Sequence, residues 1–157
     1  MIKEYIKGSI LDAPQKYIAH GVNCQNVMGS GVARVLFEKY PTVKSAYHEQ
    51  MEYDLGLYEH SSSLLGDYHL VEQIDGKIIV NMLTQDYYGY DGSKYVSYDG
   101  IQKAFECFAE SYGAGIPGAS IAIPKIGCGL AGGNWDIVSR IIDDATGDDL
   151  DVYVYYL

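Results

Sequence analysis

Hydrophobic runs are short in this sequence, and none approaches the roughly 20 residues that a helix needs to cross a membrane. The first residues, Met1 to Lys7, also lack the apolar stretch of a signal peptide. We therefore expect no membrane partner. The expected location is the cytoplasm, either of a bacterium or, for a viral protein, of its host.

Cysteine is scarce as well, with three residues in a chain of 157. Cys24, Cys107 and Cys128 are an odd number at wide spacing, which argues against a disulfide framework and against a CxxC zinc site. Reduced thiols fit a cytoplasmic protein. No regular ligand spacing supports a metal site made by His20, Cys24 and Cys128, so we expect no bound metal and no cofactor.

Positive charge is in short supply too. The chain has 11 Lys and Arg residues against 21 Asp and Glu residues, a formal net charge of −10. Sequence-independent binding of nucleic acid needs clustered Lys and Arg side chains, so this class of function is disfavoured. A small phosphorylated ligand is still compatible with this charge, because backbone N–H groups and helix N-termini bind phosphate without basic side chains.

What is present is the composition of a globular protein, with 48% hydrophobic and 20% charged residues. We find no internal repeat, no low-complexity segment and no linker. We therefore expect a single domain over residues 1–157 and a monomer.

Apolar runs and helical spacing alternate along the chain. We expect strands at Ile2–Lys7, Tyr17–Val22, Tyr68–Ile74, Lys77–Leu83, Ser120–Ile123 and Asp151–Leu157. We expect helices at Val32–Tyr40, Thr42–Glu52, between a Ser97 cap and Gly113, and from Trp135 to about Ala145. This alternation predicts an α/β fold, with helices on both faces of a mixed, mostly parallel sheet of about six strands. Asp75-Gly76 predicts a hairpin, and ligands of such sheets bind at the carboxyl ends of the strands.

Two segments combine a strand end with a glycine-rich turn and a helix start. In the first, polar residues after His20-Gly21-Val22 lead to Gly29-Ser30-Gly31. In the second, Pro124-Lys125-Ile126 leads to a run with four glycines in seven residues. Such turns bring backbone amides and a helix N-terminus close to an anion. The alternative is an ordinary connection with a glycine cap. The second segment is not a Walker loop, because the GxxxxGK[ST] lysine is absent.

Together, the stretches IAHGVNCQNVMGSGVA and PKIGCGLAGGNWDIV resemble the two ligand loops of the macrodomain family, whose members bind ADP-ribose. The intervening segment NMLTQDYYGY…VSYDGIQKAF is also similar to that family. The resemblance covers nearly the whole chain and implies a three-layer α/β/α macrodomain. It is nearest to the branch that contains ADP-ribose 1″-phosphate phosphatases and deacylating ADP-ribosyl hydrolases.

The resemblance implies roles for individual residues. Asn23 would bond the distal ribose, and adenine would lie between Gly8 to Leu11 and the last strand, where Tyr156 or Leu157 packs on the base. The other implied ligand residues lie in three loops: Ser9 and Ile10; Gly29, Ser30, Gly31 and Val32; and Gly127, Cys128, Gly129, Leu130 and Ala131. The two glycine-rich loops would hold one phosphate each. The expected partner is ADP-ribose or ADP-ribose 1″-phosphate.

The chain departs from the family pattern in two places. Ser9 stands where many macrodomains have an aspartate that bonds the adenine amino group, although Asp12 is close by. Gln85 and Ala131 stand where the deacylating hydrolases have a lysine and an aspartate. The second departure favours phosphatase chemistry on ADP-ribose 1″-phosphate. A mono-ADP-ribosyl hydrolase and a non-catalytic ADP-ribose reader are the alternatives.

For a phosphatase without metal, we expect His20 to protonate a leaving oxygen or to orient a water, and Asp86 to act as base or nucleophile. A buried structural histidine and a solvated loop carboxylate are the alternatives. A nucleophilic Cys128 would need an arginine close behind it, and none follows. Five tyrosines in or beside the segment from Thr84 to Tyr98 would form a lid over the cleft or pack the loop onto the helix beneath: Tyr87, Tyr88, Tyr90, Tyr95 and Tyr98.

Overall fold

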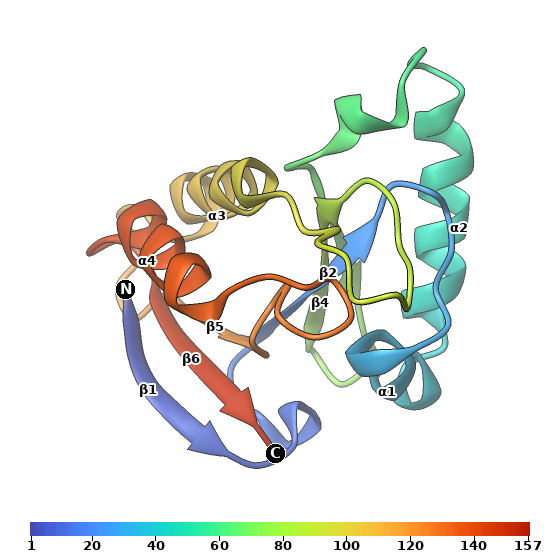
Figure 1. Ribbon diagram of the computed structural model, residues 1–157. Coiled ribbons are helices and arrows are strands. Elements are labelled where there is room, and N and C mark those ends of the chain that lie inside the picture. Colours follow the sequence, from blue (N-terminus) through green and yellow to red (C-terminus); the bar gives the residue numbers. More distant parts are fainter.

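Six strands form one sheet at the centre of the computed structural model, which describes residues 1–157 (Figure 1). The strands are β1 (Ile2–Lys7), β2 (Tyr17–Asn23), β3 (Tyr68–Glu72), β4 (Ile78–Gln85), β5 (Ser120–Ile123) and β6 (Asp151–Tyr156). Their order in the sheet is β1-β6-β5-β2-β4-β3. All neighbours are parallel except β3 and β4, which form the predicted antiparallel hairpin. The mixed, mostly parallel sheet is therefore confirmed.

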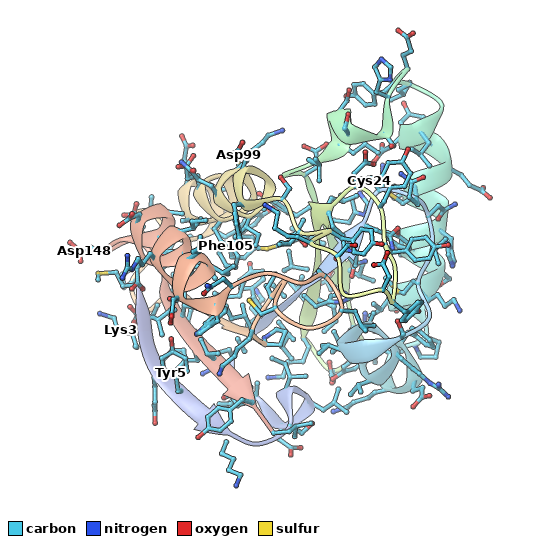
Figure 2. All side chains as sticks on the ribbon, viewed as in Figure 1. Lys3, Tyr5, Cys24, Asp99, Phe105 and Asp148 are labelled. Carbon is cyan, nitrogen blue, oxygen red and sulfur yellow. The ribbon has the colours of Figure 1, made fainter.

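Four helices cover the two faces of this sheet (Figure 1). They are α1 (Gly31–Lys39), α2 (Thr42–Leu55), α3 (Tyr98–Tyr112) and α4 (Trp135–Thr146). The core on one face joins sheet residues to Leu36 and Tyr47 of α1 and α2, and the core on the other face joins them to Phe108 and Val138 of α3 and α4. Phe105 of α3 points toward the sheet in Figure 2. This is the three-layer α/β/α arrangement that the resemblance implied.

Strand β4 shows why the sheet needs cover on both faces. Its six residues from Ile79 to Thr84 are all buried, as expected for a strand inside a parallel sheet. Neighbouring side chains alternate between the faces, so that Ile79 packs toward α1 and α2 and Val80 packs toward α3 and α4.

None of the helices has the length and hydrophobicity that a membrane span requires.

Helix boundaries follow the capping residues. The Ser97 side chain accepts a hydrogen bond from the Gly100 N–H at 3.0 Å, and α3 ends at Gly113, as predicted. The expected strand to Ile74 ends earlier, at Glu72, because the Gln73 N–H bonds the Lys77 carbonyl and begins the turn there. The other boundaries lie within a few residues of the predictions.

The parallel strands bring distant loops to one edge of the sheet. Because β1, β6, β5, β2 and β4 run the same way, the segments that follow their carboxyl ends lie together. These segments include the first glycine loop (residues 24–30) and the second glycine loop (residues 124–134). The segment between β4 and α3 lies beside them at the centre of Figure 1.

Candidate functional site

A cleft of about 680 Å³ opens at the carboxyl edge of the sheet. It is lined by residues 8–10, 20–23, 27–33, 35, 85, 88–90, 124–131 and 155–157. The two glycine loops therefore meet across one cavity, although residues 31–123 separate them in the chain. The implied ligand residues in the two glycine loops, with Ser9, Ile10, Asn23 and Tyr156, line this cleft, and so does His20. Leu11, at the end of the segment expected beside adenine, does not.

The first glycine loop is shaped by Asn23. Its side-chain Nδ2 donates to the Val27 carbonyl at 2.8 Å, and its Oδ1 accepts from the Gln25 N–H at 3.0 Å. The buried Tyr47 hydroxyl also donates to Asn23 Oδ1, at 3.0 Å. Asn23 thus holds the loop in shape and keeps one amide hydrogen for other partners.

Several cleft-lining residues of both glycine loops have main-chain N–H groups without a partner. Those of residues 29–33 donate no hydrogen bond within the chain, and the Ser30 side chain does not cap α1. Those of residues 127 and 129–131 are also free of partners. Unpaired N–H groups at a helix start and in glycine turns are the donors that phosphate prefers.

Three glycines in the cleft have no structural reason to be glycine. At Gly8, Gly29 and Gly129 an added Cβ would meet nothing within 4 Å, and none of them has a positive φ. Each of the other glycines in the chain has a close neighbour or a positive φ. A side chain at these three positions would instead fill cleft space, so the cleft is kept open for close approach to the backbone.

The cleft also differs in charge from the rest of the molecule. No Asp or Glu side chain lines it, in a chain that has 21 of them. Its one basic side chain is Lys125, whose Nζ lies 5.8 Å from the centre of the Tyr156 ring. Acidic residues such as Asp148 lie at the periphery (Figure 2). The cleft is thus suited to an anion despite the acidic composition.

The end of the cleft at β1 and β6 is formed by residues 8–10 and 155–157. Ser9 Oγ accepts from the Leu11 N–H at 3.2 Å and caps the short turn that follows. The Gly8 N–H bonds the Tyr156 carbonyl at 2.8 Å, which ties this turn to β6. Asp12 does not line the cleft, so it does not take the place of the aspartate that Ser9 replaces.

His20 lies in β2 at the floor of the cleft and is 1% exposed. Its Nε2 is bonded to Asn81 Oδ1, an atom that only accepts, so Nε2 carries the proton. Nδ1 has no partner. Burial lowers the pKa of His20 from 6.5 to about 4. The imidazole is therefore neutral near pH 7, and because Nε2 is bonded to Asn81 and Nδ1 is buried, neither nitrogen is exposed to protonate a leaving group or to orient a water.

Asp86 lies outside the cleft. Its carboxylate accepts from Ser61 Oγ at 2.6 Å and from Gln25 Nε2 at 2.9 Å. The neighbouring Gln85 lines the cleft instead. The geometry favours a structural role for Asp86, joining the first glycine loop to the short helix at Ser61–Leu64.

The thiols are not activated. Cys128 Sγ donates to the Ile126 carbonyl at 3.4 Å, and burial raises the pKa of this thiol. Burial also raises the pKa of Cys24 to about 12. Neither is poised as a nucleophile at neutral pH, and no three His, Cys, Asp or Glu side chains are grouped as metal ligands.

The tyrosines of the segment after β4 divide between both expected roles. Tyr88 and Tyr90 line the cleft, whereas Tyr95 and Tyr98 pack beneath. Gln85, which the resemblance placed where the deacylating hydrolases have a lysine, also lines the cleft, and so does Lys125, to which the sequence interpretation gave no role. The positions of these residues in the sequence could have indicated this, because Gln85 ends β4 and Lys125 lies at the start of the second glycine loop.

Comparisons with known proteins show what this chain is similar to. No family model matches the chain. An uncharacterised 17.5 kDa protein of phage T4, from the tk–vs intergenic region, is 32% identical over 148 residues, which cover 91% of this chain and 89% of that protein. Human ADP-ribose glycohydrolase OARD1 is 24% identical, covering 98% of this chain and 90% of that protein. The DNA ADP-ribosyl glycohydrolase of Mycobacterium tuberculosis is 26% identical, and the match covers 96% of this chain but 41% of that protein.

Solved structures agree with these relatives. A Bacteroides thetaiotaomicron protein of unknown function has a TM-score of 0.81 at 27% identity, and each chain is 99% covered. A macrodomain protein from Streptomyces coelicolor has a TM-score of 0.78 at 27% identity, covering 100% of this chain and 99% of that one. The macrodomain of Mycobacterium tuberculosis DarG has a TM-score of 0.77 at 26% identity, covering 100% of this chain and 98% of that one.

Proposed function

The chain belongs to the macrodomain family, and on this premise we propose that its cleft binds ADP-ribose or ADP-ribose 1″-phosphate. Adenine lies at the β1 and β6 end, between residues 8–10 and the Tyr156 ring. The diphosphate lies between the two glycine loops. The distal ribose lies beside Asn23, at the end formed by β2 and β4.

The unpartnered main-chain N–H groups support this binding most strongly. They belong to residues of both glycine loops that line one cavity without Asp or Glu side chains. Fixed N–H dipoles bind a diphosphate well because they need no reorganisation and no basic side chain. The free space at Gly29 and Gly129 lets phosphate oxygens approach the backbone.

We further propose that the protein removes the terminal phosphate of ADP-ribose 1″-phosphate, with water as the second reactant and without a metal ion. A terminal phosphate adds about two negative charges to the ligand. A cleft without Asp or Glu side chains and with unpaired N–H donors tolerates that charge and stabilises it in the transition state. The amide of Gln85, which lines the cleft, is the group that we expect to orient the water.

The names of the relatives point to a glycohydrolase as the second candidate. That candidate is weakened by two residues, because Gln85 and Ala131 stand where the resemblance implies a catalytic lysine and aspartate. A reader that binds ADP-ribose without chemistry is the third.

Two measurements test binding in the cleft and the phosphatase activity. Calorimetry with ADP-ribose tests the cleft, and absence of binding at millimolar ligand would remove all three. Phosphate release from ADP-ribose 1″-phosphate, with and without a chelator, tests the phosphatase. Turnover that needs added metal, or no turnover at all, contradicts the proposal.

Variants of the two predicted catalytic residues refine the result. His20→Gln keeps a polar side chain, and we expect turnover to persist in the folded variant because neither imidazole nitrogen is exposed to the cleft. Loss of turnover would show that His20 acts in the reaction. Asp86→Asn tests the carboxylate outside the cleft. Loss of turnover in a folded Asp86→Asn protein would show that this carboxylate acts in the reaction after all.

A further inference from the structure

The segment at residues 86–95, which we term the tyrosine strap, has a defined internal structure. An isolated bridge between Gln85 and Val96 closes its base. The Tyr95 ring packs against Gly89, where any side chain would collide with it. Asp91 Oδ1 accepts from the Tyr95 hydroxyl at 2.8 Å and from the Ser93 N–H at 3.0 Å. These contacts hold the tip of the strap in one shape.

The strap is joined to both glycine loops. On the second loop, the Ala131 carbonyl accepts from the N–H groups of Tyr95 and Val96, at 2.7 and 3.1 Å. Gly132 there lies so close to the Ser93 carbonyl that no Cβ would fit. On the first loop, the Tyr90 hydroxyl lies 3.2 Å from Ser30 Oγ, within hydrogen-bond distance. The strap therefore spans the cleft from one loop to the other.

The strap covers one end of the cleft. Strand order puts the ends of β1 and β6 at one side of the sheet and those of β2 and β4 toward the other. The strap follows β4, and its Tyr88, Gly89 and Tyr90 line the cleft. In the orientation of ADP-ribose proposed above, on which this step rests, the distal ribose lies beneath these residues.

We propose that Tyr88 and Tyr90 limit the substrate to ADP-ribose that carries nothing larger than a phosphate on its distal ribose. An ADP-ribose joined through that sugar to a protein or to DNA needs an exit for the attached chain. The two rings and the Tyr90–Ser30 contact occupy that exit. The substrate class is then a free nucleotide, and ADP-ribosylated macromolecules are excluded by shape.

The strap offers matched variants for a test. The Tyr88→Ala, Tyr90→Ala double variant removes both rings without changing net charge, so its effect does not report on the acidic surface. Tyr90→Phe keeps the ring and removes the contact with Ser30. Tyr87→Ala is the control, because Tyr87 lies in the same strap, is 61% exposed and does not line the cleft.

The experiment compares binding of free ADP-ribose, ADP-ribose 1″-phosphate, an ADP-ribosyl peptide and an ADP-ribosyl single-stranded DNA. We expect wild type to bind the two linked ligands at least about tenfold more weakly than free ADP-ribose, a difference of about 1.4 kcal/mol. The double variant narrows this gap for the peptide to about threefold or less, Tyr90→Phe keeps most of it, and Tyr87→Ala leaves it unchanged.

The possible failures are distinct. Equal binding of free and linked ligands by wild type would overturn the substrate limit and leave the proposed function intact. A gap that persists in a folded double variant would also overturn it. Failure of wild type to bind free ADP-ribose would overturn the proposed function and this inference together.

Discussion

The two glycine loops look alike in the sequence but are built differently. In the second loop, Gly127, Gly132 and Gly133 are required by packing, because an added Cβ would lie within 2.6 Å of Val96, Ser93 or Gly127 atoms. Only Gly129 of that loop has free space around it. In the first loop, Gly29 and Gly31 both face open space. The second loop is therefore a tightly packed scaffold, and the first leaves its backbone open to a ligand.

This difference shows that richness in glycine has two separate causes. Some glycines let segments of one chain pack against each other, and others leave room for a molecule that is not part of the chain. The sequence pattern does not distinguish them, whereas the space around each Cβ position does. Substitutions in the two loops should therefore affect different properties of the protein.

The largest effect should come from a packing glycine. Gly132→Ala places a Cβ 2.6 Å from the Ser93 carbonyl at a φ of +72°. We expect it to lower the free energy of unfolding by about 2–5 kcal/mol, from backbone strain and overpacking together. Gly29→Ala should change it by less than about 1 kcal/mol. Urea unfolding measures both, and equal losses would contradict the distinction between the loops.

A buried histidine in the strand before the first loop should make the stability of the fold depend on pH. The first loop follows β2, which holds the buried His20, whose pKa falls from 6.5 unfolded to about 4 folded. Between these two pKa values, His20 of the unfolded chain binds a proton that His20 of the folded chain does not bind. Stability present above pH 6.5 should fall by roughly 3 kcal/mol as the pH drops to 4.

Unfolding of wild type and His20→Gln across this range measures the effect. Burial also lowers the pKa of His69, so the wild-type curve contains both histidines, and only the difference between the two proteins reports on His20. Parallel curves would mean that His20 is not buried as a neutral group.

At the free glycine of the second loop, the expected loss is in binding rather than in stability. Gly129→Glu puts a carboxylate where the diphosphate would lie, and we expect affinity for ADP-ribose to fall at least about 100-fold, or about 2.7 kcal/mol. Because nothing lies within 4 Å of that Cβ position, the fold should be retained. Calorimetry and unfolding together check this, with Gly129→Ala as the milder control. Unchanged affinity in the Gly129→Glu variant would show that the diphosphate does not bind beside Gly129.

The smallest effect concerns Gly8-Ser9, the third place where the backbone is open. An aspartate at position 9 can keep the cap on the Leu11 N–H and add a charged acceptor for the adenine amino group. We expect Ser9→Asp to tighten ADP-ribose binding by about 1 kcal/mol, roughly fivefold. The inosine counterpart, which lacks that amino group, is the control. An equal gain for both ligands would exclude adenine recognition at this position.

Much of the fold was predictable because local signals agreed with the global arrangement. The strands Ile2–Lys7 and Ser120–Ile123 have the predicted bounds, and Ser97 caps α3 as expected. These features depend on spacing and capping chemistry within a few residues. The ligand loops were identified by resemblance, and the structure places both at one cleft.

The catalytic roles of His20 and Asp86 were harder to predict from the sequence, because they depend on burial and on the exact register of the strands. The ladder between β2 and β4 shifts between Val22 and Asn23, so that Asn23 pairs with Gln85. Gln85 then faces the cleft, and Asp86 turns away to Ser61. The low pKa of His20 arises from complete burial in the finished sheet, and no local pattern in the sequence encodes it.

The absence of Asp and Glu side chains from the cleft lining has a consequence for how a nucleotide reaches the cleft. At a distance, an incoming dianion meets the field of a molecule with a net charge of −10, and only near the cleft does it meet attractive dipoles. Added salt weakens the distant repulsion more than the short-range attraction. Capture should therefore become faster as ionic strength rises, the reverse of the behaviour of a protein that attracts phosphates through a basic surface.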